Sequence, residues 1–379
     1  MKKVLIFSTA YLPLIGGAEI AVKEITDRLG DDFAFDLICA RIKKEFPAQE
    51  KIGSINIHRT GRGGGKLDKF LLPWRGSKLA NKLYQQEKYD AIWAIMASFG
   101  GLAALFFKNK YPRVPYLLTL QEGDPTEQIE RRVGILKNWF YQIFRQADYI
   151  QAISVFLADW ARKIGVQCPI EVVPNGVTLA NYELKPITNM KEKLGIKENE
   201  KVIITASRLV EKNGIADLIK AMSSLPADVK LLILGSGPLE NNLKLLALRS
   251  LGEGGEDKIL FLGNISNDEV PRYLAVADVF VRPSLSEGLG NAFLEAMAAG
   301  VPIIGTRVGG IPDFLVDGET GLFCEVRDSQ SIADKINILL SDEALRQSLI
   351  ANGRKIVSEK YNWDGIAGRM KGIIGRLTI

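Results

Sequence analysis

The chain has 379 residues, of which 47% are hydrophobic and 25% are charged, and its formal net charge is +5. This length is too great for one ordinary core and predicts two domains of about 150 to 200 residues each. A single histidine practically excludes His-based zinc sites and Ser-His-Asp triads. The three cysteines are far apart and form no CxxC pair, which fits reduced core residues of a cytoplasmic protein.

The first half of the chain alternates short apolar runs with helical patterns, which predicts a parallel sheet with helices on both faces. The opening "MKKVLIFSTAYLP" lacks the long apolar region of a signal peptide and indicates a first buried strand instead. The longest uncharged stretch, residues 91–107, just misses the usual length of a membrane span. The expected strands are 4–9, 35–40, 55–60, 91–95, 116–120, 149–154 and 170–174.

A turn at Asn175-Gly176 ends this series, and the polar segment from Thr178 to about Glu200, with Pro186, is interpreted as a linker. The second half then resumes the alternation. Two doubly wound Rossmann-like domains, 1–175 and 176–362, are therefore expected to face each other across a cleft, with ligands at the carboxyl ends of the strands. The expected strands of the second domain are 201–207, 230–235, 258–263, 279–284, 302–306 and 321–325, and an amphipathic helix closes the chain.

The segment "SEGLGNAFLEAMAAG", residues 286–300, places Glu287 on a glycine loop and Glu295 near the start of a short helix. Backbone N–H groups at such a helix start can hold an anion, while the carboxylates accept hydrogen bonds from hydroxyls. This pattern suits a ligand that carries both phosphate and sugar. Three further segments could contribute.

In "STAYLPLIGGAE", Gly16 and Gly17 could let the backbone approach a phosphate, or could simply cap a helix after a flexible loop. In "ASRLVEKNG", Arg208 and Lys212 could clamp a diphosphate, or could be solvated surface residues. The turn "LGSGPLENNL" lacks the third glycine of a dinucleotide fingerprint and favours a structural role. No metal ligand set is predicted.

Charge is unevenly distributed along the chain. Residues 1–175 hold 25 Lys/Arg against 18 Asp/Glu, a net charge of +7. Within them, 59–82 combine seven basic residues with one acid and an apolar "FLLPW" run. This segment could be an acceptor loop, a contact with anionic lipid headgroups, or a mobile solvated loop. "RRVGILKNWFYQIFR" offers a second basic and aromatic stretch, as core helix or membrane-facing surface.

Together these segments resemble glycosyltransferase family 4, the retaining nucleotide-sugar enzymes of GT-B fold. The resemblance covers nearly the whole chain and is strongest from "ASRLVEKNG" through "PSLSEGLGNAFLEAMAAGVPIIGTRVGGIPDF". It implies an N-terminal acceptor-binding domain, a C-terminal donor-binding domain, and a last helix, 363–379, that packs back on the first. No cofactor is implied beyond a nucleoside diphosphate sugar (UDP- or GDP-linked) as co-substrate.

By the same resemblance, Arg208 and Lys212 would bind the donor diphosphate, Glu287 would bind hydroxyls of the transferred sugar, and Glu295 would bind the ribose. The further donor-binding positions implied are Gly16, Gly17, Asn264, Ile265, Gly288, Leu289, Gly290 and Asn291.

Two departures from the family stand out. Gln121 and Glu122 occupy a sugar-pocket or acceptor position where many members carry a histidine, and Asn213 separates Lys212 from the loop glycine.

The resemblance thus implies metal-independent, retaining transfer of a hexose to a saccharide or lipid-linked glycan, in the cytoplasm and peripherally at the inner membrane face. The alternatives are an epimerase or phosphorylase of the same fold, and a catalytically silent sugar-nucleotide-binding protein. A nucleic-acid partner has no supporting motif.

Overall fold

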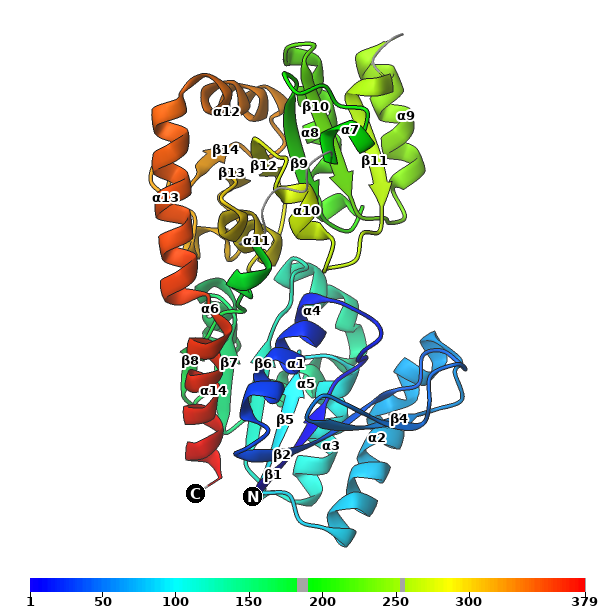
Figure 1. Ribbon diagram of the computed structural model, residues 1–379. Helices are drawn as coiled ribbons and strands as arrows, with labels where there is room; N and C mark the ends of the chain where they lie inside the picture. Colours follow the sequence, from blue (N-terminus) through cyan, green and yellow to red (C-terminus); the bar gives the residue numbers. More distant parts are fainter. Residues whose placement is uncertain (183–189, 253–255, 379) are drawn as a thin grey trace. The chain divides into compact units, whose positions relative to one another are not determined.

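The computed structural model describes residues 1–182, 190–252 and 256–378 (Figure 1). By its internal contacts the chain divides into two compact units, 1–175 with 363–379 and 176–362, which we call unit 1 and unit 2. Pro186, expected in the linker, lies outside the described residues. None of the helices in the described parts of the chain is long and apolar enough to cross a membrane.

Unit 1 is built on an eight-stranded sheet in the order β3-β4-β2-β1-β5-β6-β7-β8. All neighbouring strands are parallel except β3, which pairs antiparallel with β4. The strands are β1 Lys2–Phe7, β2 Phe33–Ala40, β3 Gln49–Ile52, β4 Ile55–Thr60, β5 Ala91–Ile95, β6 Tyr116–Leu120, β7 Tyr149–Ala152 and β8 Ile170–Val172. The helices are α1 Gly17–Leu29, α2 Lys66–Gln86, α3 Phe99–Lys110, α4 Thr126–Val133, η1 Gly134–Leu136, α5 Lys137–Arg145, α6 Val155–Ile164 and α14 Trp363–Leu377.

Alternation along the strands divides the core of unit 1 between the two faces of the sheet. Val4 and Ile6 of β1 face a cluster that includes α1 and α14. Phe7 points to the other face, where its ring lies 6.1 Å from that of Phe107 on α3. The sheet is therefore covered on both sides, which explains why its strands are continuous apolar runs.

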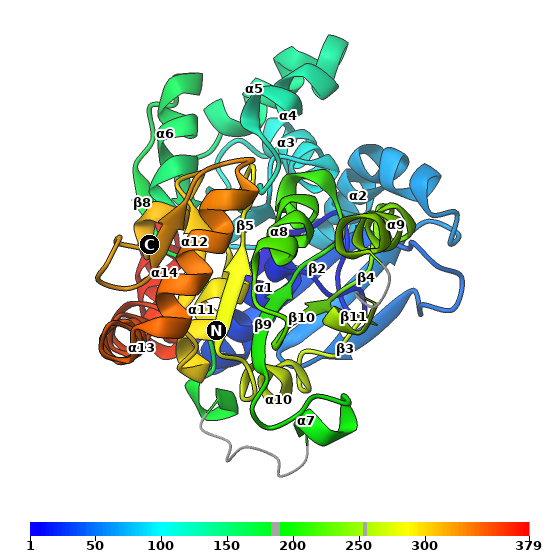
Figure 2. The same cartoon turned by 90° about the horizontal axis from the view of Figure 1, so that it is seen from above.

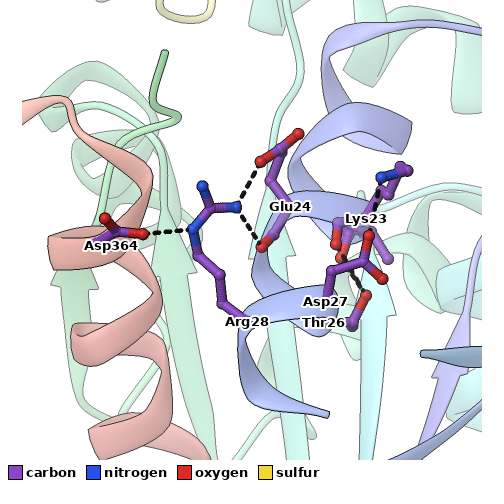
Figure 3. Close-up of polar contacts among 7 residues, drawn as sticks. Lys23, Glu24, Thr26, Asp27, Arg28 and Asp364 are labelled. Carbon is purple, nitrogen blue, oxygen red and sulfur yellow. Dashed lines mark hydrogen bonds and ion pairs between the residues drawn. The ribbon is translucent and has the colours of Figure 1, made fainter. Parts of the chain in front are cut away.

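The last helix, α14, belongs to unit 1 although nearly two hundred residues of unit 2 precede it in the chain. Its buried side chains, among them Met370 and Ile373, complete the core beside α1. Figure 3 shows Arg28 of α1 between Glu24 and Asp364, and its Nε donates to Asp364 at 2.7 Å. Because Asp364 is 89% exposed, burial of the apolar face stabilises this contact more than the ion pair does.

Unit 2 is built on a six-stranded, fully parallel sheet in the order β11-β10-β9-β12-β13-β14. Figure 2 shows β10 between β9 and β11. The strands are β9 Lys201–Ala206, β10 Val229–Leu234, β11 Ile259–Gly263, β12 Val279–Arg282, β13 Ile303–Thr306 and β14 Leu322–Cys324. The α-helices are α7 Met190–Lys193, α8 Ile215–Ala221, α9 Glu240–Leu251, α10 Val270–Leu274, α11 Asn291–Ala299, α12 Ser329–Ser341 and α13 Glu343–Lys360. The 3₁₀ turns are η2 Leu179–Tyr182, η3 Glu211–Asn213, η4 Met222–Ser224, η5 Glu256–Lys258 and η6 Ile311–Asp313.

The strand order reverses once in each sheet. In unit 2 the chain moves outward from β9 through β10 to β11, and then starts again on the other side of β9 with β12. In unit 1 the same reversal lies between β1 and β5. In open α/β sheets, ligands bind outside the carboxyl ends of the strands at such a reversal. The loops that follow β1, β5, β9 and β12 are therefore the expected positions for ligand binding.

Candidate active site

In unit 2, the two loops at the reversal are locked to each other by backbone contacts. The loop after β9 carries Arg208 and Lys212, and the loop after β12 carries Glu287. The N–H of Leu285 donates to the carbonyl oxygen of Lys212 at 2.6 Å. Gly214 has a φ of +68°, and a Cβ there would overlap the backbone carbonyl of Pro283. The structure thus brings together the two segments predicted to hold a diphosphate and a sugar.

Asn213 has a structural task within the first of these loops. Its side chain is buried, and its amide Nδ2 donates to the carbonyl oxygen of Arg208 at 2.6 Å. This hydrogen bond closes the turn that presents the exposed guanidinium of Arg208. Lys212 is half-buried on the same turn.

Glu287 is fixed from several sides. Its Oε1 accepts the N–H of Gly288 at 3.1 Å, and its Oε2 accepts a hydrogen bond from the guanidinium of Arg282. Its carbonyl oxygen accepts the N–H of Gly310 at 3.1 Å, from the loop after β13. Gly309 in that loop has a φ of +55° and leaves no room for a Cβ against the same carbonyl. The carboxylate is therefore oriented before any ligand arrives.

Glu295 lies on α11, which Gly290 caps at its amino end and Gly300 closes. Glu295 is the fifth residue of this helix, near its start as expected, because α11 begins at Asn291. Burial raises the pKa of Glu295, and the nearby Arg282 opposes this. Leu289 is buried, so its side chain packs inside unit 2.

Asn264 and Ile265 follow β11, on the far side of β10 from β9. Asn264 is exposed and its Oδ1 accepts from the hydroxyl of Ser236 at 2.8 Å. Ser236 belongs to the glycine turn after β10. In that turn the N–H of Gly235 donates to the carbonyl oxygen of Gly263 at 2.7 Å. The turn that resembled a weak dinucleotide signal therefore supports the loop that carries Asn264.

In unit 1, Gly16 is the amino-terminal cap of α1 and Gly17 is its first residue. The carboxylate of Glu19, in the first turn, lies against Gly16. Burial raises the pKa of Glu19, while backbone N–H groups of Glu19 itself and Gly16 oppose the shift. Sequence reasoning had considered the two glycines and had not assigned this acid a role. In the structure, the carboxylate of Glu19 accepts the backbone N–H groups of Gly16 and of Glu19 itself.

Gln121 and Glu122 follow β6 of unit 1. The Oε1 of Gln121 accepts from Asn175 Nδ2 at 3.0 Å. Glu122 is buried, its Oε1 accepts the N–H of Ala97 at 2.6 Å, and its Oε2 has no hydrogen-bond partner among the described residues. Burial raises the pKa of Glu122 to about 7. Met96, which precedes Ala97 in the chain, has a left-handed φ of 68°. The hydrogen bond from Ala97 to Glu122 therefore holds a strained turn at the end of β5.

Two residues near the site were not found from the sequence. Arg282 is the last residue of β12 and is 6% exposed. The one signal for it is an arginine inside the otherwise apolar strand "VFVRPS". Tyr182 of η2 carries a pKa raised by burial and by the nearby Glu295, and no pattern in the sequence connects these two positions. Over the described ranges, no group of His, Cys, Asp and Glu side chains is arranged to hold a metal ion.

Comparison with known proteins identifies the family of the chain. Residues 15–181 match the family described as Glycosyltransferase Family 4, and residues 186–356 match Glycosyl transferases group 1. N-acetyl-alpha-D-glucosaminyl L-malate synthase of Bacillus anthracis is 30% identical over 373 residues, covering 95% of this chain and 94% of the relative. A GDP-mannose-dependent alpha-(1-6)-phosphatidylinositol monomannoside mannosyltransferase of Mycobacterium tuberculosis is 32% identical over 235 residues, 59% of this chain and 60% of the relative.

Solved structures of the same fold cover the whole chain. Sucrose-phosphate synthase of Thermosynechococcus elongatus superposes with a TM-score of 0.85 at 22% identity, covering 100% of this chain and 99% of the other. HepE of Anabaena, in complex with UDP and glucose, gives a TM-score of 0.80 at 21% identity over 99% of this chain and 100% of the other. With its two Rossmann-like sheets and both family matches, the chain belongs to the family 4 glycosyltransferases of GT-B fold.

Proposed function

We propose that this glycosyltransferase transfers a hexose from a UDP- or GDP-linked donor to a saccharide or lipid-linked glycan, with retention of anomeric configuration and without a metal ion. The observation that carries the proposal is the locked pair of loops in unit 2, which presents Arg208 and Lys212 beside a pre-oriented Glu287. The names of two similar proteins, one dependent on GDP-mannose and one bound to UDP and glucose, support a nucleotide-sugar donor.

The residues suit the charge changes of such a transfer. As the bond to the leaving group breaks, negative charge grows on the phosphate and positive charge grows on the sugar ring. Arg208, Lys212 and the amino end of α11, from Gly288 to Asn291, would oppose the first. Glu287 would bind donor hydroxyls, and Glu295 would bind the ribose. The leaving phosphate would accept the proton of the acceptor, so that no strong protein base is needed.

The remaining predicted positions would complete the two substrate sites. Asn264 and Ile265 would border the nucleobase, and Gly16 with Gly17 would contribute backbone N–H groups to a phosphate, which at Gly16 would replace the carboxylate of Glu19. Gln121 and Glu122 would line a sugar or acceptor pocket. Because glutamine cannot take up a proton, Gln121 would act by hydrogen bonding alone.

A thermal-shift panel of UDP, GDP, ADP and CDP, each with and without its hexose, tests the donor site. A ligand at about 100 times its Kd adds roughly 2.7 kcal/mol to the free energy of unfolding, which is a measurable shift. We expect one base to stabilise the protein and both Arg208→Ala and Glu295→Ala to lose that shift. If no nucleotide stabilises the protein, the proposal is refuted.

Three further readouts test the chemistry once a donor is found. Product anomeric configuration by proton NMR tests retention, and activity after EDTA treatment tests metal independence. A changed sugar nucleotide formed without acceptor would indicate an epimerase. Donor binding with neither transfer nor hydrolysis, over a broad acceptor panel, would indicate a silent binding protein.

We also propose that unit 1 works at an anionic membrane surface. Large apolar side chains lie in a row on three adjacent helices: the exposed Leu67, Phe70 and Trp74 of α2, the partly buried Phe106 of α3 and the exposed Trp139 of α5, which we call the aromatic face. Leu67 is 60%, Phe70 50%, Trp74 49% and Trp139 41% exposed. The rings are continuous, with centroids 5.9 Å apart for Phe70–Trp74, 6.0 Å for Trp74–Phe106 and 5.5 Å for Phe106–Trp139.

The charge of the same helices favours an anionic partner over a second copy of the chain. The sequences of α2, α3 and α5 contain five, two and two basic residues, and their one acid is Asp68. Asp68 is buried, and it accepts from the backbone N–H groups of Arg62 and Gly64 and from Arg75. Lys108 of α3 is buried and pairs with Asp148, and the remaining basic residues still give these helices an excess of positive charge, which would repel another copy and attract acidic headgroups.

Flotation with vesicles of neutral lipid, alone or with anionic lipid, tests this surface. We expect binding only to the anionic vesicles, reduced by salt and by the double variant Phe70→Ser/Trp74→Ser. Leu245→Ser is the matched control, because Leu245 is a 52% exposed residue of α9 in unit 2. Equal binding by the control and the double variant would refute the assignment to the aromatic face.

A further inference from the structure

Arg282 is a buried cation that the proposed chemistry leaves unused. It ends β12, a strand whose residues are all buried, and it is itself 6% exposed. A charge in this position costs free energy unless it is paired and hydrogen-bonded. The groups that pair with the guanidinium of Arg282 therefore indicate its role.

The two terminal nitrogens of the guanidinium meet different parts of the candidate site, while Nε has no hydrogen-bond partner among the described residues. Nη2 donates to the carboxylate of Glu287, and Nη1 reaches the carbonyl oxygen of Ala206 at 3.4 Å. Ala206 ends β9, two residues before Arg208. The plane of the group lies over the ring of Phe293 in α11, with Cζ 4.9 Å from the ring centroid. Arg282 thus ties both loops of the site to α11.

The pairing leaves Glu287 with little freedom. The side chain of Glu287 is 13% exposed and that of Arg282 is 7% exposed, so solvent screens their attraction only weakly. One carboxylate oxygen of Glu287 is taken by Arg282 and the other accepts the N–H of Gly288. An oxygen that accepts one such bond retains a second lone pair, and that is the direction left for a sugar hydroxyl.

We infer that Arg282 is a positioning residue that holds the carboxylate of Glu287 aimed at the transferred sugar, and that it acts on the transfer through Glu287. This inference rests on the proposed role of Glu287 in binding donor hydroxyls. Arginine suits the task because its planar fork reaches Glu287 and Ala206 together while stacking on Phe293. A lysine could satisfy the charge and not the fork.

A general loss of structure would lower both the affinity for the nucleoside diphosphate and the rate of sugar transfer, whereas loss of a positioning residue should affect mainly the transfer. Arg282→Met should weaken binding of the nucleoside diphosphate by a smaller factor than it slows transfer, because Arg282 is only a neighbour of the proposed nucleotide ligand Glu295 while it hydrogen-bonds Glu287 directly. The same variant should lower kcat/KM for the nucleotide sugar by about 10- to 100-fold, the range that follows from misplacing a group that orients the substrate. Arg282→Lys should recover part of this loss.

A double-mutant cycle with Glu287→Gln completes the test, since residues that act as one unit give non-additive losses. We expect the double variant Arg282→Met/Glu287→Gln to be little worse than Glu287→Gln alone. Arg354→Met is the matched control: Arg354 donates to Ala299 at the other end of α11 at 3.2 Å, and its loss should leave kcat/KM unchanged.

The possible outcomes discriminate clearly. Additive losses, or equal losses of diphosphate binding and of transfer, would overturn the inference. If Arg282→Met does not fold, Arg282→Lys and its cycle with Glu287→Gln decide the same question. If the wild-type protein itself binds no nucleoside diphosphate, the proposed function fails first, and the two failures are thereby distinguished.

Discussion

Gly309→Ala tests whether the loop after β13 positions Glu287. Gly309 has a φ of +55°, and an added Cβ would overlap the backbone carbonyl of Glu287. That carbonyl is also held by the N–H of Gly310 at 3.1 Å. Because backbone lies on both sides of the overlap, no flexible side chain can move away to relieve it. The substitution must therefore displace one of the two loops.

The cost has two parts. A residue with a Cβ in the left-handed region costs about 1–2 kcal/mol, and overpacking in a tight site costs typically about 1–3 kcal/mol. A total near 3 kcal/mol would lower Tm by roughly 6–12 °C for a domain of about 150–250 residues. Gly318→Ala is the matched control, since Gly318 has a φ of +74° with nothing within 4 Å of its Cβ position. Only the first part of the cost applies there.

Differential scanning calorimetry and the rate of sugar transfer measure both consequences. We expect Gly309→Ala to unfold at a lower temperature than Gly318→Ala, and to lose at least about tenfold in kcat/KM while the control retains its activity. Equal values of Tm and of kcat/KM in the two variants would show that the close approach of the loops has no role in positioning Glu287.

Three further predictions concern single side chains. The pKa of Glu122 is raised to about 7 in the folded protein, so the folded state binds the extra proton and the free energy of unfolding should fall by up to about 3 kcal/mol as pH rises from about 4.5 through 7. Glu122→Gln should flatten that decrease in urea unfolding at pH 5 and pH 8, and an unchanged slope would contradict it. Asn213→Ala removes the bond to the carbonyl of Arg208 and should cost about 1–3 kcal/mol and weaken nucleotide binding by calorimetry; unchanged affinity would mean that the turn holds without it. Asp364→Asn should lower the free energy of unfolding by less than about 1 kcal/mol. Met370→Ala, at a fully buried position, should lower it by about 2–5 kcal/mol, as measured by urea unfolding. The reverse order would show that the ion pair holds α14.

The sequence predicted the sheets well because their strands are buried on both faces and appear as continuous apolar runs. Each of the thirteen runs named in the sequence analysis overlaps a strand of the structure. The strand that was missed, β3, reads "QEKI", lies at the sheet edge and is partly exposed, so neither its composition nor its pattern distinguishes it from a loop. It also makes the sheet of unit 1 mixed instead of purely parallel.

The candidate site was only partly predictable, and the reason is geometric. The sequence pointed to Arg208 because it lies two residues after a strand end, and to Glu287 because it lies beside a glycine turn in the loop after a strand. The partnership of Arg282 with Glu287 depends on how the loop folds back over its own strand, and the bond from Asn213 to Arg208 depends on one turn. Such contacts are set by three-dimensional closure and leave no periodic trace in the sequence.

The path of the chain has a consequence for how the protein matures on the ribosome. Unit 1 begins the chain, yet Trp363, Ile366 and Met370 of its core lie in α14. Domains generally fold as units while synthesis proceeds from the amino end. The segment that started first must therefore wait, with part of its apolar surface uncovered, until α14 has been translated. Unit 2, translated later, has all its residues available earlier, so completion of the two units should follow the opposite order to their synthesis.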